Sequence, residues 1–182
     1  MSSAHRSVGI REAQPADVPA LAALHVAAFV EAHGPVGAPG YEVRERQWRA
    51  AFADPAPWFA CLAVTPDGQL IGFAKGTRHD GGVPGFAGEL NKLYVRREWH
   101  RSGVGRRLVA WTARRFLEHG VPSMLLFGDA RSPANGFYEH LGAERLLSPE
   151  GEFHGGYGWR DLRPLVVGDG GQCRTMRRPT AG

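Results

Sequence analysis

Cysteine is scarce in this sequence, and so are long apolar runs. Only Cys61 and Cys173 occur among 182 residues, and Cys61 lies in an apolar, strand-like stretch. Two cysteines so far apart do not make a disulfide framework, so we expect reduced thiols and a cytoplasmic protein. No apolar run has the length of a membrane span, and residues 1–10 lack the hydrophobic core of a signal peptide. We therefore expect no membrane contact.

Two common kinds of ligand motif are also missing. The glycine-bearing turn at residues 100–105 is not followed by Gly-Lys-Ser/Thr, which excludes a Walker loop. A dinucleotide fingerprint is excluded because Leu108 stands where its third glycine would be. The eight histidines show no metal-ligand spacing with a carboxylate or cysteine partner. We therefore predict that the protein binds no metal.

What is present is typical of one globular domain. The chain is 43% hydrophobic, which is ordinary, and its length suits a single core. Its net charge is +4, which nucleic-acid binding through a basic tail would explain. A site for a polyanionic cofactor explains it as well, and we favour that interpretation over nucleic acid. We expect a folded domain over residues 1–163 and a flexible, basic tail over residues 164–182.

The most informative stretch is residues 89–117, which predict a strand, a tight turn and an amphipathic helix. The first N–H groups of a helix lack internal acceptors, and the helix dipole is positive there. Glycine lets that backbone approach a ligand closely. With Arg101, Arg106 and Arg107 beside it, the turn predicts a phosphate or pyrophosphate site, with a plain structural turn as the alternative.

The other segments complete a recognisable order of elements. Asp67-Gly68 between two apolar runs predicts a hairpin, and segments rich in glycine and proline separate the remaining elements. We expect strands at residues 8–11, 58–65, 70–76, 90–95, 123–127, 144–147 and 157–162, and helices over residues 21–29, 41–52, 109–117 and 133–141.

At residues 100–105 the sequence resembles the acetyl-coenzyme A motif of the GNAT (Gcn5-related N-acetyltransferase) superfamily, Q/R-x-x-G-x-G/A. It stands here as His100-x-x-Gly103-x-Gly105, with His in place of Gln or Arg. Residues 135–143, NGFYEHLGA, are similar to the family's C-terminal signature. The resemblance implies an α/β (α+β) fold, the GNAT fold. Its single mixed, mostly antiparallel sheet of six to seven strands is flanked by about four helices and splayed at the central strands.

The resemblance also implies acetyl-CoA as co-substrate and assigns the residues that bind it. Backbone N–H groups of the turn would hold the pyrophosphate, and the free edge of the central strand would pair with the pantetheine arm. Asn135 would hydrogen-bond the pantetheine near the thiol. The full set is Leu93, Tyr94, Val95, Arg101, Ser102, Gly103, Val104, Gly105, Arg106, Asn135 and Tyr138.

Two residues are implied to act in catalysis, as acid and base in acetyl transfer to a primary amine within a ternary complex. Tyr138 matches the family's general acid, and a phenol of pKa about 10 can protonate the departing thiolate. Glu89 is our candidate for the general base, with an ordered water chain as the alternative. Even spacing along the strand would put Glu89 on the face of Leu93 and Val95.

Several features of function are left open by the sequence. The acceptor is a small-molecule amine or an exposed peptide amine. A non-catalytic acyl-CoA-binding sensor or interaction module is the alternative function. Glu31, Glu42 and Glu45 are either ligands of a cationic amine or ordinary helix-surface charges. A homodimer is open as an alternative to a monomer.

Overall fold

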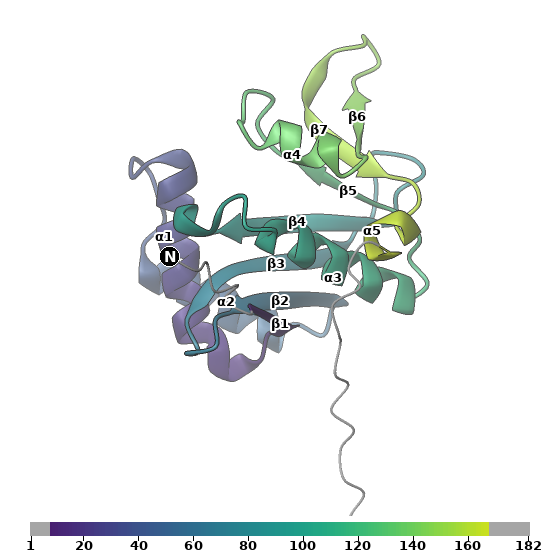
Figure 1. Cartoon of the computed structure of the whole chain (residues 1–182). Coiled ribbons are helices and arrows are strands. Elements are labelled where there is room, and N and C mark those ends of the chain that lie inside the picture. The colour runs from purple at the N-terminus through teal and green to yellow at the C-terminus, as the bar shows by residue number, and fades with distance from the viewer. Residues whose placement is uncertain (1–7, 168–182) are drawn as a thin grey trace, which may run out of the picture.

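Seven strands form one mixed sheet in the order β1-β2-β3-β4-β5-β7-β6, with helices on both faces (Figure 1). The computed structural model describes residues 8–167. Its strands are β1 (Gly9–Glu12), β2 (Trp58–Val64), β3 (Leu70–Arg78), β4 (Gly88–Val95), β5 (Met124–Phe127), β6 (Glu144–Leu147) and β7 (Phe153–Trp159). Its helices are α1 (Val18–His33), α2 (Tyr41–Ala53), α3 (Val104–Glu118), α4 (Asn135–His140) and α5 (Arg163–Val167). Among the described strands only β4 and β5 are parallel neighbours, so the predicted fold class is confirmed.

Two apolar clusters, one on each face of the sheet, hold the helices in place. The amphipathic face of α3 buries Leu108 and Phe116 in the first cluster. On the opposite face, Leu21 of α1 and Trp48 of α2 pack with Phe73 of β3 in the second. A fully buried side chain of this kind contributes roughly 1.5–3 kcal/mol. The burial pattern of each helix therefore decides which face of the sheet it covers.

His25 and Cys61 are core residues. His25 is 1% exposed, and its Nδ1 accepts a hydrogen bond from Trp48 Nε1 at 3.2 Å. Burial lowers the pKa of His25 to about 3, so the ring is neutral at neutral pH. Burial raises the pKa of the Cys61 thiol to about 12, and the expectation of a free thiol is confirmed for this residue. Cys173 lies outside the described residues.

The helical stretch Pro15–His33 corrects one expectation. Its 19 residues, of mean hydropathy 1.2, are long and apolar enough for a membrane span by length and composition alone. The expectation that no apolar run reaches that length is therefore wrong. In this fold Leu21, Ala22, Leu24 and Ala28 are buried, and a core helix explains the same composition.

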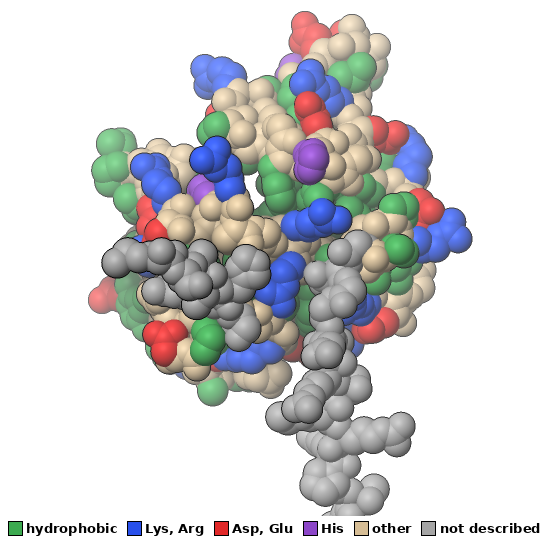
Figure 2. Space-filling model, viewed as in Figure 1, with side chains coloured by type: hydrophobic (Ala, Val, Ile, Leu, Met, Phe, Trp, Pro, Cys, Tyr) green, Lys and Arg blue, Asp and Glu red, His purple; other side chains and the backbone are tan. Residues whose placement is uncertain are grey.

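The sheet divides between β4 and β5. These parallel strands pair only at Gly88 with Met124 and at Glu89 with Leu125. Beyond that point β4 continues to Val95 with β3 alone, so one strand edge faces an opening. Figure 1 shows β4 and β5 diverging, and Figure 2 shows the surface hollowed between the two halves, with basic side chains near the hollow. The predicted splay is confirmed.

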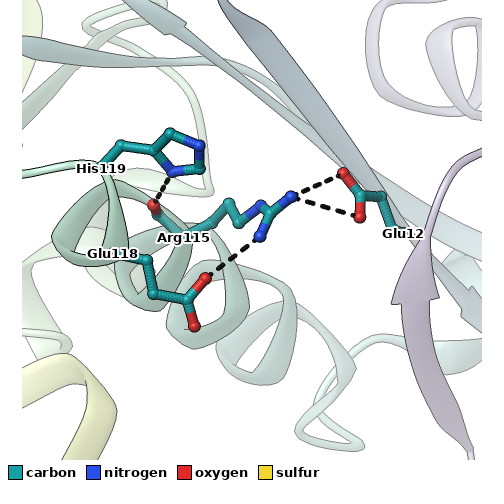
Figure 3. A network of polar contacts seen from close by, with 4 residues as sticks. All are labelled: Glu12, Arg115, Glu118 and His119. Carbon is teal, nitrogen blue, oxygen red and sulfur yellow. Dashed lines mark hydrogen bonds and ion pairs between the residues drawn. The ribbon is translucent and has the colours of Figure 1, made fainter. Parts of the chain in front are cut away.

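A polar network fastens the end of α3 to β1 (Figure 3). Arg115 donates to Glu118 at 3.2 Å and to the two carboxylate oxygens of Glu12 at 3.2 and 3.4 Å. The Arg115 carbonyl lies 2.7 Å from His119 Nδ1. Surface pairs of this kind contribute at most about 1 kcal/mol each. The network therefore helps to set the direction of α3, whose other end carries the glycine-bearing turn.

Helix α5 crosses the domain boundary predicted at residue 163. Leu165 and Val166 pack against the cluster that α3 fills, and Leu165 N–H donates to the Leu162 carbonyl at 3.1 Å. The expectation of a flexible tail is therefore wrong for residues 164–167. The rest of the predicted tail, residues 168–182, lies outside the described residues.

Candidate active site

The turn before α3 presents a run of backbone N–H groups that have no acceptor in the described part of the chain. They belong to residues 101–106, and the next one, from Arg107, bonds the Gly103 carbonyl at 3.1 Å. Arg101 and Gly103 have positive φ angles of 57° and 84°. Left-handed residues in a turn direct successive N–H groups toward one side and make a concavity for an anion. The dipole of α3 adds positive potential at the same place.

Gly105 brings this turn against α4. A β-carbon on Gly105 would lie 3.3 Å from Phe137 Cζ and 3.9 Å from Val95 Cγ2. The first separation is tighter than ordinary van der Waals contact, so a larger residue here would require Phe137 to move by a few tenths of an ångström. The two sequence motifs therefore form one continuous surface with β4.

The basic side chains around the turn have different partners. Arg101 and Arg106 are exposed, and neither forms an ion pair within residues 8–167. Arg107 instead donates through Nη1 to the Val8 carbonyl at 2.6 Å. The structure thus gives Arg107 a structural contact in place of the predicted phosphate contact, and Arg101 and Arg106 stay as candidates. The Ser102 hydroxyl bonds the carbonyl of Trp99, which leaves its backbone N–H for a ligand.

The open edge of β4 lies beside the turn. Arg96 N–H donates to the Ile71 carbonyl of β3 at 2.8 Å. Because backbone groups alternate in direction along a strand, those of Leu93 and Val95 point away from β3, toward the opening. One of these groups has a partner already, since His100 Nε2 lies 2.9 Å from the Val95 carbonyl. The histidine that departs from the family motif therefore donates to the strand edge as its Nε2–H tautomer.

Tyr138 lies on α4 within a group of aromatic rings. Its ring centroid is 5.3 Å from that of Phe137, 5.5 Å from Tyr157 and 6.4 Å from Trp159. Burial raises the pKa of Tyr138 to about 12, with smaller contributions from Tyr94 and Tyr157. Its side chain is only partly covered, and its hydroxyl has no hydrogen-bond partner among the described residues. That hydroxyl is therefore free to donate to a ligand.

Asn135 has a structural use at the start of α4. Its Nδ2 donates to the Asp129 carbonyl at 3.2 Å and to the Ala130 carbonyl at 2.8 Å. Both amide protons brace the loop between β5 and α4, so a bond to pantetheine would use Oδ1 as an acceptor. The contact predicted for Asn135 stays a prediction.

The register of β4 on β3 contains a β-bulge at Asn91. Lys92 opposes Lys75, but Leu90 opposes Gly76, so Asn91 is the extra residue. A bulge interrupts the regular alternation of side chains between the two faces of a sheet.

The bulge changes the direction of Glu89. Leu90 and Leu93 are three positions apart, yet both pack into the cluster beneath α3, so Glu89 faces the opposite side of the sheet. Tyr94 also faces that side and packs into the cluster of α1 and α2. The expectation that Glu89 shares a face with Leu93 and Val95 is therefore wrong, because even spacing assumed an unbroken strand.

His79 is a candidate residue that sequence reasoning missed. Its Nδ1 lies 3.7 Å from Glu89 Oε2, and its side chain is 9% exposed. Asn91 Nδ2 donates to the other carboxylate oxygen, Oε1, at 3.0 Å. The Nε2 atom of His79 is buried without a hydrogen-bond partner in the described residues. His79 stands in a glycine-rich loop without periodicity, and the bond from its N–H to the Ala87 carbonyl, 3.0 Å long, helps to place it beside Glu89.

Two of the three acidic residues on the helices are bound to other partners. Glu31 accepts the Arg97 backbone N–H at 2.9 Å and pairs with Arg96 Nε at 2.9 Å. Glu45 pairs with Arg49 at 2.7 Å. Glu42 is exposed in the first turn of α2. These contacts favour the helix-surface interpretation for Glu31 and Glu45.

The donors of the turn fit a pyrophosphate. Unpaired backbone N–H groups, exposed arginines and a close glycine backbone are what such a polyanion requires. Within residues 8–167, no three His, Cys, Asp or Glu side chains come together in a way that could hold a metal.

Comparisons with known proteins agree with this geometry. A family model described as the acetyltransferase (GNAT) family matches residues 20–143. The chain is 28% identical over 170 residues to the uncharacterized N-acetyltransferase YuaI of Bacillus subtilis (strain 168), an alignment that covers 87% of this chain and 96% of that protein. It is 37% identical over 111 residues to an aminoglycoside N(6')-acetyltransferase type 1 of Stenotrophomonas maltophilia, covering 57% of this chain and 66% of that protein.

A solved structure shares the fold. The PaiA N-acetyltransferase of Thermoplasma acidophilum, in complex with coenzyme A, superposes with a TM-score of 0.64 at 16% identity, covering 84% of this chain and 98% of that one. The family model spans more than half of the sequence and includes β4, the turn and α4. The chain therefore belongs to the acetyltransferase (GNAT) family and is an acetyl-CoA-dependent acyltransferase.

Proposed function

We propose that the protein transfers the acetyl group of acetyl-CoA to a primary amine by direct attack of the amine in a ternary complex. The observation that carries this proposal is the split between β4 and β5, which pair at only two positions. The turn and Tyr138 border one side of the split, and Glu89 faces the other. Acetyl-CoA supplies the reactive thioester.

The cofactor and the amine bind on different sides of the sheet. The unpaired N–H groups of residues 101–106 lie on the side of α3, where they suit the pyrophosphate, and the edge groups of Leu93 and Val95 point into the opening, where they suit the amides of pantetheine. Glu89 faces the side of α1 and α2. The amine therefore approaches from the face opposite the cofactor, and the two substrates meet at the split.

Tyr138 acts on the departing sulfur as a hydrogen-bond donor. Its pKa of about 12 lies above the value of about 8.5 for a free thiol, so complete proton transfer to the thiolate is uphill by about 5 kcal/mol. Tyr138 therefore gives up its proton only as another replaces it. The nitrogen of the attacking amine supplies that proton as the N–C bond forms and the C–S bond breaks.

Glu89 accepts the first proton of the amine, which must be neutral to attack. Asn91 holds one of its carboxylate oxygens at 3.0 Å, and His79 lies 3.7 Å from the other. A carboxylate held in this way can take the proton through one water. The water chain predicted as the alternative base requires no change to the rest of the scheme.

An acetyl-CoA-dependent thiol-release screen tests the proposal. Amines, amino acids, aminoglycosides and short peptides would each be supplied with acetyl-CoA, and free thiol and acetylated product would be measured. We expect thiol release that depends on the acceptor, with equal amounts of acetylated amine. Tight binding of acetyl-CoA by calorimetry without turnover of any acceptor would instead indicate an acyl-CoA-binding sensor.

A further inference from the structure

Three cationic side chains gather on the α1–α2 face of the sheet, the face of Glu89. Lys75 of β3 and Lys92 of β4 stand directly opposite each other. Burial lowers the pKa of Lys92, and the charges of Lys75 and Arg44 lower it further, while Glu89 acts in the opposite direction. Arg44, on α2, is thus close enough to Lys92 for their charges to interact. We call Arg44, Lys75 and Lys92 the cationic cluster.

None of the three forms an ion pair within residues 8–167. Lys75 Nζ lies 5.1 Å from the centroid of the Trp58 ring, a contact that covers the ammonium without neutralising it. Arg44 is 7% exposed, and its Nη1 donates to Gln47 at 3.0 Å. Its Nε is buried and has no hydrogen-bond partner among the described residues.

An arrangement of this kind is costly without an anion. Like charges directly opposite each other destabilise a sheet, and partly buried cations lose solvation unless they are paired. The acidic groups that influence the two lysines are Asp54 for Lys75 and Glu89 for Lys92, and neither is an ion-pair partner. A bound carboxylate would neutralise the cluster.

We propose that the cationic cluster binds a carboxylate of the acceptor, so that the substrate class is an amine that also carries a carboxylate group. This inference rests on the proposed function. With the carboxylate at Lys92 and Arg44, the amino group of the same molecule lies toward Glu89. The positive field of the cluster also favours the neutral, nucleophilic form of that amine. The same field repels polycationic acceptors, which separates this chain from its aminoglycoside-modifying relative.

Kinetics with matched acceptors test the specificity. An amino acid, its primary amide and its decarboxylated amine differ only in the carboxylate. We expect the wild-type kcat/KM to be roughly ten- to a hundredfold higher for the acid, the range of a charge-assisted contact. Lys92→Gln and Arg44→Gln should abolish this preference, and Arg46→Gln should keep it because Arg46 is exposed on the same helix. Equal kcat/KM for the three compounds, or faster acetylation of polyamines, would overturn the inference and leave the proposed function intact.

Direct binding provides a second measurement. It needs no turnover, and its comparison of two ligands uses the wild-type protein, so it stands even if one variant is unstable. Calorimetry with coenzyme A present would compare the N-acetylated amino acid with its amide. We expect the acid alone to bind and Lys92→Gln, at a half-buried position, to weaken it at least tenfold. Equal binding of acid and amide, or no binding of either, contradicts the inference even if no amine is acetylated.

Discussion

Phe137 of α4 rests against Gly105 of α3, with its Cζ 3.3 Å from the place that a β-carbon on Gly105 would occupy. Gly105 belongs to the turn whose N–H groups suit a pyrophosphate, and Phe137 precedes Tyr138, which suits the sulfur. The proposed phosphate end and the proposed thiol end of the cofactor site are therefore in direct contact through the protein. We therefore expect a substitution at either end to displace residues at the other.

Gly105→Ala tests this contact. The new β-carbon must push the Phe137 ring away by a few tenths of an ångström, which displaces Tyr138 from the sulfur. Since misplacement by about 1 Å can cost a hundredfold, we expect kcat to fall roughly tenfold and KM for acetyl-CoA to rise. Gly136→Ala is the matched control, because a β-carbon there meets open space. Similar steady-state kinetics for the two variants would rule out the coupling.

Removing the hydroxyl of Tyr138 tests its role at the sulfur. We expect Tyr138→Phe to lower kcat roughly a hundredfold or more, the usual loss for an acid–base group, with KM for acetyl-CoA nearly unchanged. Because its pKa is about 12, the loss should stay constant between about pH 6 and 9. Tyr157→Phe removes the hydrogen bond to Glu139, 2.8 Å long, and should cost about 1 kcal/mol of stability without changing kcat. Full turnover by Tyr138→Phe would contradict the assignment.

The contact between His79 and Glu89 predicts a non-additive pair of mutations. Glu89→Gln should lower kcat roughly a hundredfold, and His79→Ala should lower it several-fold by loosening the carboxylate. Because His79 acts through Glu89, its substitution should have no further effect in the Glu89→Gln background. His154→Ala, at an exposed position, is the control. Losses that multiply in the double variant would show that His79 acts independently of Glu89.

We can test whether His100 supports cofactor binding in the place of the Gln or Arg of the family motif. Its Nε2–H donates to the Val95 carbonyl at 2.9 Å, and a glutamine amide offers the same donor. We expect His100→Gln to keep KM for acetyl-CoA within about twofold, and His100→Ala to raise it roughly three- to tenfold, the value of one net hydrogen bond. Equal KM values for the two variants would show that the bond to Val95 does not support cofactor binding.

The elements and the turn could be predicted because local signals mark them. Asp67-Gly68 sets a two-strand hairpin, and Gly103 and Gly105 mark the start of a helix. The position of Phe137 and Tyr138 on a short helix followed from a motif of neighbouring residues. Each of these features depends on contacts between residues that are close in sequence.

The orientation of Glu89 could not be predicted, because it depends on how two strands pair. The bulge at Asn91 is visible only in the register of β4 on β3. No residue type in the strand predicts it. His79, in a loop, and Arg44, on another helix, reach the face of Glu89 through packing between segments far apart in the sequence. The sequence therefore indicated the positions of the turn and of α4 well, but not the face of the sheet on which Glu89 lies or the residues that share that face.

His25 predicts how stability depends on pH. Its folded-state pKa is about 3, below the value of about 6.5 in an unfolded chain. In this pH range the unfolded state therefore binds a proton that the folded state does not bind. The free energy of unfolding falls as pH decreases from about 6.5 toward 3. Between pH 7 and 5 the loss from this group is about 2 kcal/mol, at about 1.4 kcal/mol per unit.

Urea unfolding of His25→Gln at both pH values measures that contribution. Glutamine keeps an acceptor for Trp48 Nε1–H but does not titrate, so the free energy of unfolding should fall by about 2 kcal/mol less than in the wild type. His33→Gln, exposed at the end of the same helix, should keep the wild-type dependence. If the free energy of unfolding of His25→Gln fell as much as that of the wild type between pH 7 and 5, His25 would not be the group responsible for the loss of stability in acid.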